Sequence, residues 1–237
     1  MFSEKITTAF VLSAGKGTRL RPLTDACPKP LLPVNGRPLI TYIFDHLVQA
    51  GVRRIIVNTH HLAEKYEETF PEKKWKDAAL FFRHEPVLLD SAGGLKNIED
   101  LWGDEENIFT YNGDVISSLS LSALMERHLA RKNEVTLALR SQGEPRNVGL
   151  DEQDEVGDIR GVLGRQGLRS FLFTGIYAVN RRFLGRLEKG RAESVVDVFL
   201  RMIREKSGSV GGIVLDDGEW RTAGTLAEYE KINTLKQ

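Results

Sequence analysis

The sequence has very little cysteine, no net charge and no long apolar run. Cys27 is the only cysteine in 237 residues, so a disulfide-stabilised scaffold is excluded and a reducing compartment is natural. The 33 basic residues are matched by 33 acidic ones, which argues against a broad basic surface for nucleic acid. No stretch has the length of a membrane span, and the first apolar run is too short for a signal peptide. We therefore expect a cytoplasmic protein with no nucleic-acid or membrane partner.

Glycine and positive charge are concentrated in one segment near the N-terminus. An apolar strand expected at 8–12 leads directly into Gly15 and Gly17, which let the backbone approach a ligand closely and expose N–H groups to it. Arg19 and Lys29 add fixed positive charge within the same stretch. The segment therefore predicts a loop that binds polyphosphate.

Two common phosphate-binding patterns do not fit this loop. The P-loop requires Ser or Thr after its Gly-Lys pair, but Gly17 follows Lys16. The dinucleotide-binding pattern requires a third glycine where Leu20 stands. What remains is Gly-x-Gly-Thr-Arg-Leu-x-Pro-Leu-Thr from Gly15, followed by Pro-Lys-Pro-Leu-Leu-Pro-Val from Pro28.

In order and spacing, these two patterns resemble the signature of the sugar-1-phosphate nucleotidylyltransferase family, also called NDP-sugar pyrophosphorylases. A glycine-rich turn with surface cations would not require Thr18, Thr24 and the proline-flanked Lys29 together. The compact chain looks most like short bacterial members, similar to mannose-1-phosphate guanylyltransferases and N-acetylmuramate 1-phosphate uridylyltransferases. The resemblance covers nearly the whole chain and implies a nucleotide-diphospho-sugar transferase fold.

Strand and helix signals alternate through the first part of the chain, with short connections between them. This order predicts an α/β fold with a Rossmann-like, mostly parallel central sheet and helices on both faces. Ligands of such sheets bind at the carboxyl ends of the strands, where both the glycine loop and Asp114 are expected. The expected strands are 8–12, 54–57, 79–82, 108–111 and 135–139, and the expected helices are 38–50, 62–70, 94–101 and 121–130.

Beyond residue 140 the alternation is less regular, and we expect a smaller α+β lobe. Its expected strands are 159–163, 171–179 and 210–215, and its expected helices are 194–204 and 226–235. We predict one domain over 1–237, in which 1–140 binds the nucleotide and 141–237 binds the sugar phosphate.

The resemblance implies in-line transfer of a nucleotidyl group, which needs positioning and charge neutralisation rather than a covalent enzyme nucleophile. Arg19 would bind the departing β- and γ-phosphates, and Lys29 would lie between the α-phosphate and the sugar phosphate. The backbone around the glycines would bind the nucleotide, through Leu12, Ala14, Gly15, Gly17 and Thr18.

Asp114 is the expected ligand for Mg²⁺, because a carboxylate with substrate phosphates and waters is the usual magnesium arrangement. The family pattern Trp-x-Asp-x-Gly-Thr normally adds a second carboxylate, but Thr222 occupies that position here. Three hypotheses follow. Asp114 holds the metal with water and phosphate alone, or a carboxylate among Asp216, Asp217 and Glu219 reaches in, or activity is lost.

The nucleobase and acceptor contacts are less sharply indicated. Glu85 could accept two N–H groups from guanine but only one from uracil, which slightly favours GTP over UTP. Ala92 and Gly93 resemble a segment that packs against the base. The predicted sugar-phosphate contacts, with Arg165 or Arg169 replacing a family lysine, are Asn112, Gly149, Thr174, Gly175 and Arg165.

The sequence therefore predicts a Mg²⁺-dependent enzyme that condenses a nucleoside triphosphate with a sugar 1-phosphate and releases pyrophosphate. One alternative is a cytidylyltransferase acting on a non-sugar phosphate such as phosphocholine. The other is a non-catalytic module that binds nucleotide sugars, because Thr222 replaces the usual aspartate.

Overall fold

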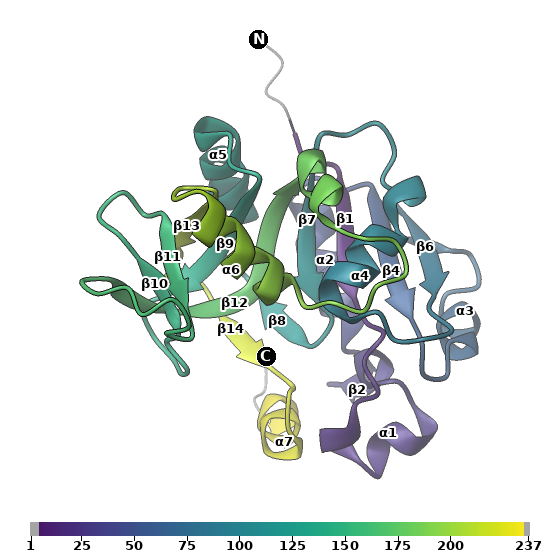
Figure 1. Cartoon of the computed structure of the whole chain (residues 1–237). Helices are drawn as coiled ribbons and strands as arrows, with labels where there is room; N and C mark the ends of the chain where they lie inside the picture. The colour runs from purple at the N-terminus through teal and green to yellow at the C-terminus, as the bar shows by residue number, and fades with distance from the viewer. Residues whose placement is uncertain (1–4, 235–237) are drawn as a thin grey trace.

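The computed structural model describes residues 5–234 and is organised around one large sheet (Figure 1). Four parallel strands form its centre, in the spatial order β7 (Asn107–Asn112), β1 (Thr8–Leu12), β4 (Arg54–Thr59) and β6 (Ala78–His84). The short antiparallel strand β5 (Lys74–Trp75) closes the edge beside β6. The predicted mostly parallel centre of the sheet is confirmed.

The long strand β12 (Arg169–Asn180) carries the sheet from the first half of the chain into the second. It pairs antiparallel with β7 on one side, and with β9 (Val135–Arg140) and β10 (Val148–Leu150) on the other. Beyond these, β13 (Val210–Val214) pairs parallel with β9, and β11 (Val156–Ile159) pairs antiparallel with β10. Strand β9 ends at Arg140 and pairs with β12 and β13, which both come after it in the chain. The sheet therefore continues across the boundary that we expected at residue 140. The division of ligand binding between the two halves stays a prediction.

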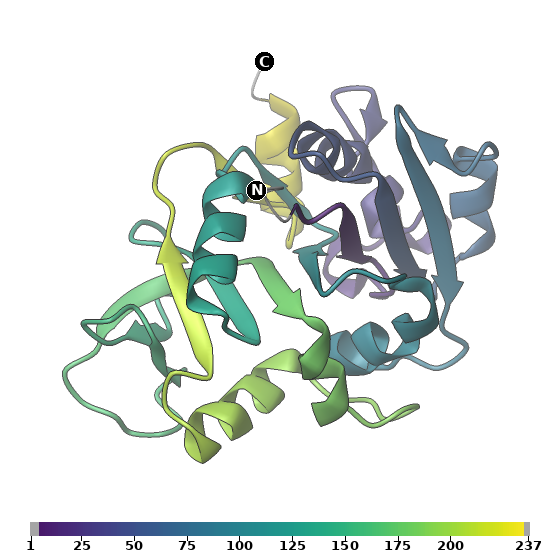
Figure 2. The same cartoon turned by 90° about the horizontal axis from the view of Figure 1, so that it is seen from above.

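Helices cover both faces of the sheet, as the alternating pattern predicted (Figure 2). Along β1, Ala9 and Val11 face one core and Phe10 faces the other, the two-residue period of a strand buried on both sides. The first core includes side chains of α2 (Ile40–Gln49), α3 (Glu64–Thr69), α5 (Leu121–Arg131) and α7 (Leu226–Thr234). The second includes side chains of α4 (Asp90–Asn97) and α6 (Val195–Glu205).

Several predicted boundaries were wrong, among them those of three elements. The strand expected at 159–163 ends at Ile159, because Arg160 and Gly161 have φ values of +60° and +70° and turn the chain. The helix expected at 94–101 begins at Asp90, and its end is a separate 3₁₀ turn, Glu99–Leu101. The helix expected from residue 38 begins at Ile40, because β3 (Arg37–Pro38) pairs with β2 (Pro33–Val34). Leu235, the expected end of the last helix, lies outside the described residues.

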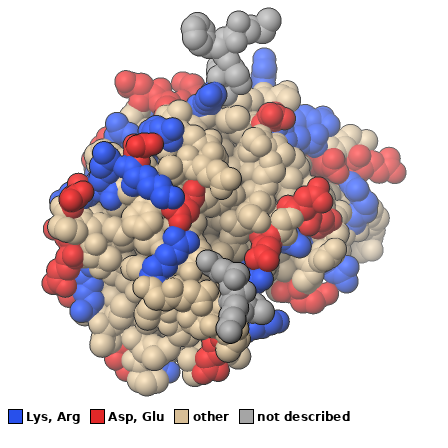
Figure 3. All heavy atoms as spheres, turned by 180° about the vertical axis from the view of Figure 1, so that it is seen from behind, with Lys and Arg blue, Asp and Glu red and all other residues tan. Residues whose placement is uncertain are grey.

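The surface carries both signs of charge in close mixture. The face shown in Figure 3 has acidic and basic side chains interspersed rather than gathered by sign. This agrees with the balanced composition. Within residues 5–234, no helix is both long enough and apolar enough to span a bilayer.

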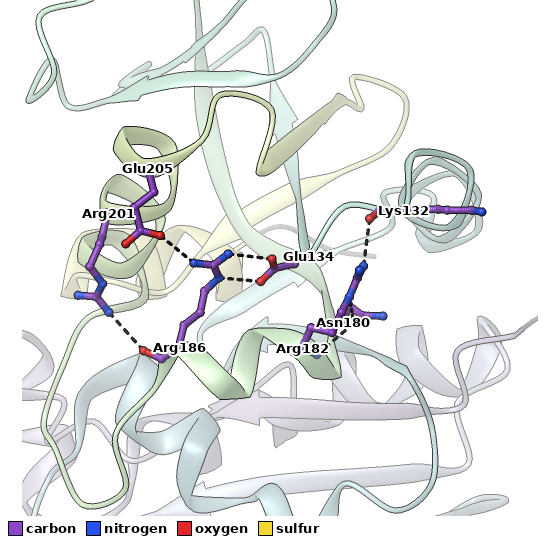
Figure 4. A network of polar contacts seen from close by, with 7 residues as sticks. All are labelled: Lys132, Glu134, Asn180, Arg182, Arg186, Arg201 and Glu205. Atoms are coloured by element: carbon purple, nitrogen blue, oxygen red, sulfur yellow. Dashed lines mark hydrogen bonds and ion pairs between the residues drawn. The ribbon is translucent and has the colours of Figure 1, made fainter.

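An ion network ties the start of β9 to α6 (Figure 4). Arg186 makes a two-pronged contact with Glu134, at 2.7 and 2.9 Å, and reaches Glu205 at 2.9 Å. Arg201 of α6 donates to the Arg186 carbonyl at 3.4 Å. The guanidinium contact lowers the pKa of Glu134 and raises that of Arg186. Because both side chains are partly exposed, we expect a contribution of about 1 kcal/mol or less to stability.

His128 of α5 is a buried histidine that joins the helix to the sheet. It is 1% exposed, its Nδ1 accepts from the Thr136 hydroxyl at 2.9 Å, and its Nε2–H donates to Asn107 Oδ1 at 3.0 Å. Burial, with a smaller effect of the Arg182 charge, lowers the pKa of His128 to about 4. The folded protein therefore holds this ring neutral.

We predict that protonation of His128 in the unfolded chain destabilises the fold at acidic pH. An unfolded histidine takes up its proton near pH 6.5 and the folded one near pH 4, so stability falls as the pH drops between these values. By pH 5 the loss due to this residue is about 2 kcal/mol. Urea unfolding of wild type and His128→Gln at pH 7 and pH 5 measures it. An equal loss of unfolding free energy between pH 7 and pH 5 in wild type and His128→Gln contradicts the prediction. His84→Gln, which replaces a histidine with an exposed side chain, is the control.

Candidate active site

The candidate site begins where two parallel strands end side by side. Leu12 at the end of β1 is opposite Asn112 at the end of β7, and the Gly113 N–H donates to the Leu12 carbonyl at 2.8 Å. A Cβ at Gly113 would lie 2.5 Å from that carbonyl oxygen and 2.7 Å from Ser13 Oγ. Only glycine fits here, so the loop after β1 lies directly against the residues that lead to Asp114.

The loop after β1 is fixed by its second glycine. Gly17 has φ +63°, and its carbonyl accepts from the Leu20 N–H and the Thr24 hydroxyl, both at 2.9 Å. A Cβ at Gly17 would lie 2.8 Å from Thr24 Cγ2. Thr24 is 1% exposed and therefore holds the loop rather than a ligand. Gly15, in contrast, has no heavy atom within 4 Å of its Cβ position, so its backbone is open to a ligand.

A close ion pair joins this loop region to the end of β7. Lys29 begins the 3₁₀ helix Lys29–Leu31, and its Nζ lies 2.5 Å from Asp114 Oδ2. The two side chains are 12% and 25% exposed, so the pair lies at the floor of the site rather than on the open surface. Arg19 is exposed and makes no ion pair within residues 5–234, which leaves its guanidinium free for an anion.

Two cavities meet at this point. The first, of about 510 Å³, is lined by most of the predicted phosphate and metal residues, namely Leu12, Gly15, Gly17, Thr18, Arg19, Lys29, Asn112 and Asp114. The second, of about 690 Å³, includes Ala14 and Glu85. It shares Leu12, Gly15, Asp90 and Asn112 with the first, so the two form one continuous cleft. The structure therefore brings together the residues predicted at the two strand ends.

Thr222 stands beside Asp114, where the family pattern has its second carboxylate. It ends β14 (Trp220–Thr222), opposite Val115 of β8 (Val115–Ser117), and the next N–H, from Ala223, donates to the Asp114 carbonyl at 2.9 Å. Each of the replacement carboxylates whose contacts are described is engaged elsewhere. Asp216 accepts from the Ser141 N–H and hydroxyl, and Glu219 pairs with Arg221. Their predicted entry into the site is not supported.

A different carboxylate, Glu228, lies near Thr222. From the Cβ position of Gly224, Glu228 Oε2 is 2.9 Å away and Thr222 Oγ1 is 3.5 Å away. Glu228 Oε2 accepts from the Thr225 N–H at 2.8 Å and its hydroxyl at 3.0 Å. This is a capping box, and its Thr-x-x-Glu spacing was visible in the sequence. Glu228 therefore orders the start of α7 next to the cleft.

The donor set at Asp114 suits a magnesium ion that brings its own phosphate ligands. In the described part of the chain, no three His, Cys, Asp or Glu side chains group into a metal site. Magnesium is commonly held by one or two carboxylates, with phosphate oxygens and waters completing its octahedron. One carboxylate is therefore sufficient once a triphosphate is present, which is the first of the three hypotheses.

Glu85 is bonded within the protein rather than open to a base. Its side chain is 0% exposed, Oε1 accepts from Asn58 Nδ2 at 2.8 Å, and Oε2 accepts from the Leu89 N–H at 3.1 Å. Asn58 Oδ1 in turn accepts from the Ser13 N–H at 2.7 Å. Both oxygens of Glu85 are thus used to connect the loop after β1 with the loop before α4.

Asp90, to which the sequence analysis assigned no role, lines both cavities. It is exposed and has φ +57°, a left-handed conformation that is uncommon for aspartate. Ala92 and Gly93 are buried behind it. A Cβ at Gly93 would lie 2.2 Å from the Arg191 carbonyl oxygen, so this glycine packs against the chain rather than a base.

The structure places the predicted acceptor residues in several different positions. Asn112 lines both cavities, and Gly175, with φ +77°, makes room for it, because a Cβ there would lie 2.5 Å from Asn112 Nδ2. Thr174 is 1% exposed, and its hydroxyl donates to the Ala138 carbonyl, away from the cleft. Gly149 and Arg165 line a third cavity, of about 480 Å³, which shares only Arg160 with the second.

A family model described as nucleotidyl transferase matches residues 8–237. The chain belongs to this family. It is 35% identical over 228 residues to the N-acetylmuramate alpha-1-phosphate uridylyltransferase of Neisseria meningitidis, covering 96% of this chain and 97% of that protein. It is 32% identical over 225 residues to the mannose-1-phosphate guanylyltransferase of Mycobacterium tuberculosis, covering 93% of this chain but only 62% of that longer protein.

The chain also shares its fold with solved structures. HddC from Yersinia pseudotuberculosis, crystallised with GMP-PN, superposes with a TM-score of 0.79 at 20% identity, covering 97% of this chain and 99% of HddC. At that identity the likeness shows the fold alone. It confirms the expected nucleotide-diphospho-sugar transferase architecture.

We predict that Glu85 supports the cleft rather than selecting the base. Glu85→Gln places an amide where two donors converge, so it should lower stability by about 1–3 kcal/mol while leaving the ratio of activities with GTP and UTP within about twofold. Denaturant unfolding and paired initial rates with the two triphosphates measure this. A stable variant whose GTP-to-UTP ratio changes tenfold would instead assign Glu85 to base recognition.

We also predict that Thr222→Asp tightens metal binding. A second carboxylate beside Asp114 adds a charged ligand, so the affinity for Mn²⁺ used as a probe should rise about tenfold. Titration followed by the electron paramagnetic resonance signal of free Mn²⁺ measures it without reference to turnover. Ser117→Asp, on the neighbouring strand β8, is the matched control for added charge. An unchanged Mn²⁺ affinity shows that position 222 does not limit metal binding.

Proposed function

We propose that this chain transfers a nucleoside monophosphate, from GTP or UTP, to a sugar 1-phosphate. An oxygen of the sugar phosphate attacks the α-phosphorus, the bond between the α-phosphorus and its bridging oxygen breaks, and pyrophosphate leaves with the electron pair. The observation that carries the proposal is the continuous cleft in which three features meet. They are the open backbone at Gly15, the Arg19 guanidinium, which forms no ion pair within residues 5–234, and the Lys29–Asp114 pair.

Each of these groups would have a distinct part in the transfer. The backbone N–H groups around Gly15 and Gly17 would hold the triphosphate, and Arg19 would bind its β- and γ-phosphates. Lys29 would turn from Asp114 toward the α-phosphate and sugar phosphate, drawing the two anions together. Asp114, released from that pair, would bind Mg²⁺, which supplies charge neutralisation on the phosphates.

The relatives support a sugar phosphate as acceptor and guanine or uracil as base. The two relatives described above are named for guanylyl and uridylyl transfer to sugar 1-phosphates. These names favour catalysis over the binding-module alternative, and they favour sugar 1-phosphates over phosphocholine. We propose a cytoplasmic site for the reaction, in keeping with the single cysteine, and cell fractionation followed by immunoblotting checks it.

Pyrophosphate release tests the proposal directly. GTP, UTP, CTP and dTTP are each combined with mannose, N-acetylglucosamine, N-acetylmuramate and heptose 1-phosphates, and CTP also with phosphocholine. We expect turnover with GTP or UTP and at least one sugar 1-phosphate, and a loss of about 100-fold or more in Lys29→Met. The absence of turnover with every pair, or turnover with phosphocholine alone, overturns the proposal.

A matched pair of arginine variants separates the phosphate cradle from general surface charge. Arg19→Gln should lower kcat/KM for the triphosphate about 30-fold, because it removes a charge-assisted contact with the leaving phosphates. Arg21, two residues on, is 61% exposed and pairs with Asp25, so Arg21→Gln should change the value less than twofold. Equal effects of the two substitutions contradict the role given to Arg19.

A further inference from the structure

One cation on the wall of the larger cavity is unused by the proposed function. Arg160 follows β11 and is the sole Lys or Arg among the residues lining that cavity. The opposite strand ends contribute Leu12, Ala14 and Asn112 to the same cavity. The Arg160 side chain is exposed, and among the residues that the structure describes it has neither a hydrogen-bond nor an ion-pair partner. The other charged residues that line this cavity are the carboxylates Glu85 and Asp90, and within residues 5–234 the Arg160 guanidinium pairs with neither.

The neighbouring arginines, unlike Arg160, each have a hydrogen-bond or ion-pair partner. Arg165 donates to the Ile203 carbonyl at 3.0 Å, and Arg169 donates to the Asp151 carbonyl and Asp154 Oδ1, both at 2.7 Å. Arg146 pairs with Glu144 at 3.2 Å. The sequence-based expectation that Arg165 or Arg169 faces the acceptor is therefore not supported by their contacts, whereas Arg160 lines the cavity with its guanidinium unpaired.

The turn that carries Arg160 is held by a buried carboxylate. Asp158 is 5% exposed and accepts from the Leu163 N–H at 3.1 Å and the Arg165 N–H at 3.4 Å. The Arg160 N–H donates to the Asn147 carbonyl at 2.6 Å. Arg160 itself has φ +60°, where glycine is favoured and a side chain is strained. The fold thus keeps an arginine where its backbone conformation alone would favour glycine.

We propose that Arg160 binds an oxyanion of the acceptor, on the side of the cleft away from Lys29. The proposal rests on the proposed function, because that reaction requires an anionic acceptor in this cavity. A guanidinium suits a phosphate or a carboxylate equally, through two parallel N–H donors. The oxyanion therefore has two sources, the 1-phosphate common to all acceptors or a carboxylate carried by an acidic sugar.

Two acceptors that differ by one carboxylate distinguish these sources. N-acetylglucosamine 1-phosphate and N-acetylmuramate 1-phosphate share the sugar and the phosphate, and the second adds a lactyl ether. The acceptor KM of wild type, Arg160→Gln and Arg160→Lys is measured in steady-state turnover with each of the two acceptors. Calorimetric binding of each acceptor in the presence of a non-hydrolysable triphosphate analogue gives a second measure. Arg146→Gln, on the adjacent outer cavity, is the matched control.

We expect Arg160→Gln to raise the acceptor KM and Kd about 10- to 100-fold while the triphosphate KM changes less than twofold. Weakening of both acceptors assigns the contact to the phosphate, and weakening of the acidic acceptor alone assigns it to the carboxylate. Arg160→Lys should recover part of the loss. If Arg160→Gln leaves both acceptors within twofold of wild type, the inference is overturned while the proposed function stands. If wild type neither binds nor turns over any acceptor, both fail.

Arg160→Gly separates a binding role from a structural one. Glycine adopts φ +60° without strain, so this variant should unfold at the same temperature as wild type or a higher one. It should nevertheless show the same loss of acceptor affinity as Arg160→Gln. A lowered unfolding temperature in Arg160→Gly would mean that the side chain serves the fold instead.

Discussion

The parallel pairing of β1 with β7 is the constraint on which the rest of the site depends. It sets Leu12 beside Asn112, and the missing side chain at Gly113 lets the two strand ends stay within hydrogen-bond distance. The loop after β1 and the carboxylate after β7 then share one edge of the sheet, where strand backbones leave groups unpaired. Lys29 can reach Asp114 only because of this juxtaposition.

A buried polar chain makes the edge rigid. It runs from the Ser13 N–H through Asn58 and Glu85 to the Leu89 N–H. In a low-dielectric interior such bonds are strong, and each unpaired member would be costly, so the three loops cannot shift independently. Both oxygens of Glu85 are used in this chain of hydrogen bonds, so this carboxylate has no ligand role although it lies next to the cleft. Asp90 follows Leu89, where this series of hydrogen bonds ends, and lines both cavities.

The charged residues of the site differ in how they are paired. With Thr222 in place of an aspartate, Asp114 is paired with Lys29, and within residues 5–234 neither Arg19 nor Arg160 forms an ion pair. The charged residues that line the first cavity are two of each sign, Arg19 and Lys29 with Asp90 and Asp114, and those that line the second are Arg160, Glu85 and Asp90. The cations are therefore placed for individual anionic groups rather than as a general positive field. In the proposed reaction, a magnesium ion at Asp114 would take most of its ligands from the triphosphate and water, as is usual for magnesium.

The sequence by itself determined the fold class, the glycine-rich loop after β1 and the place of Asp114 after a strand, because these rest on local signals. Glycine spacing, apolar periodicity and a strand followed by Asn112-Gly113-Asp114 are legible within a few residues. Only the tertiary structure decided which side chains face the cleft. Glu85 and Thr174 had suitable chemistry, but both side chains are buried and hydrogen-bonded within the protein, whereas Arg160 was hidden by an expected strand that in fact ends at Ile159. Side-chain direction depends on where a strand stops and on which distant donors it meets, and neither is encoded within a local pattern.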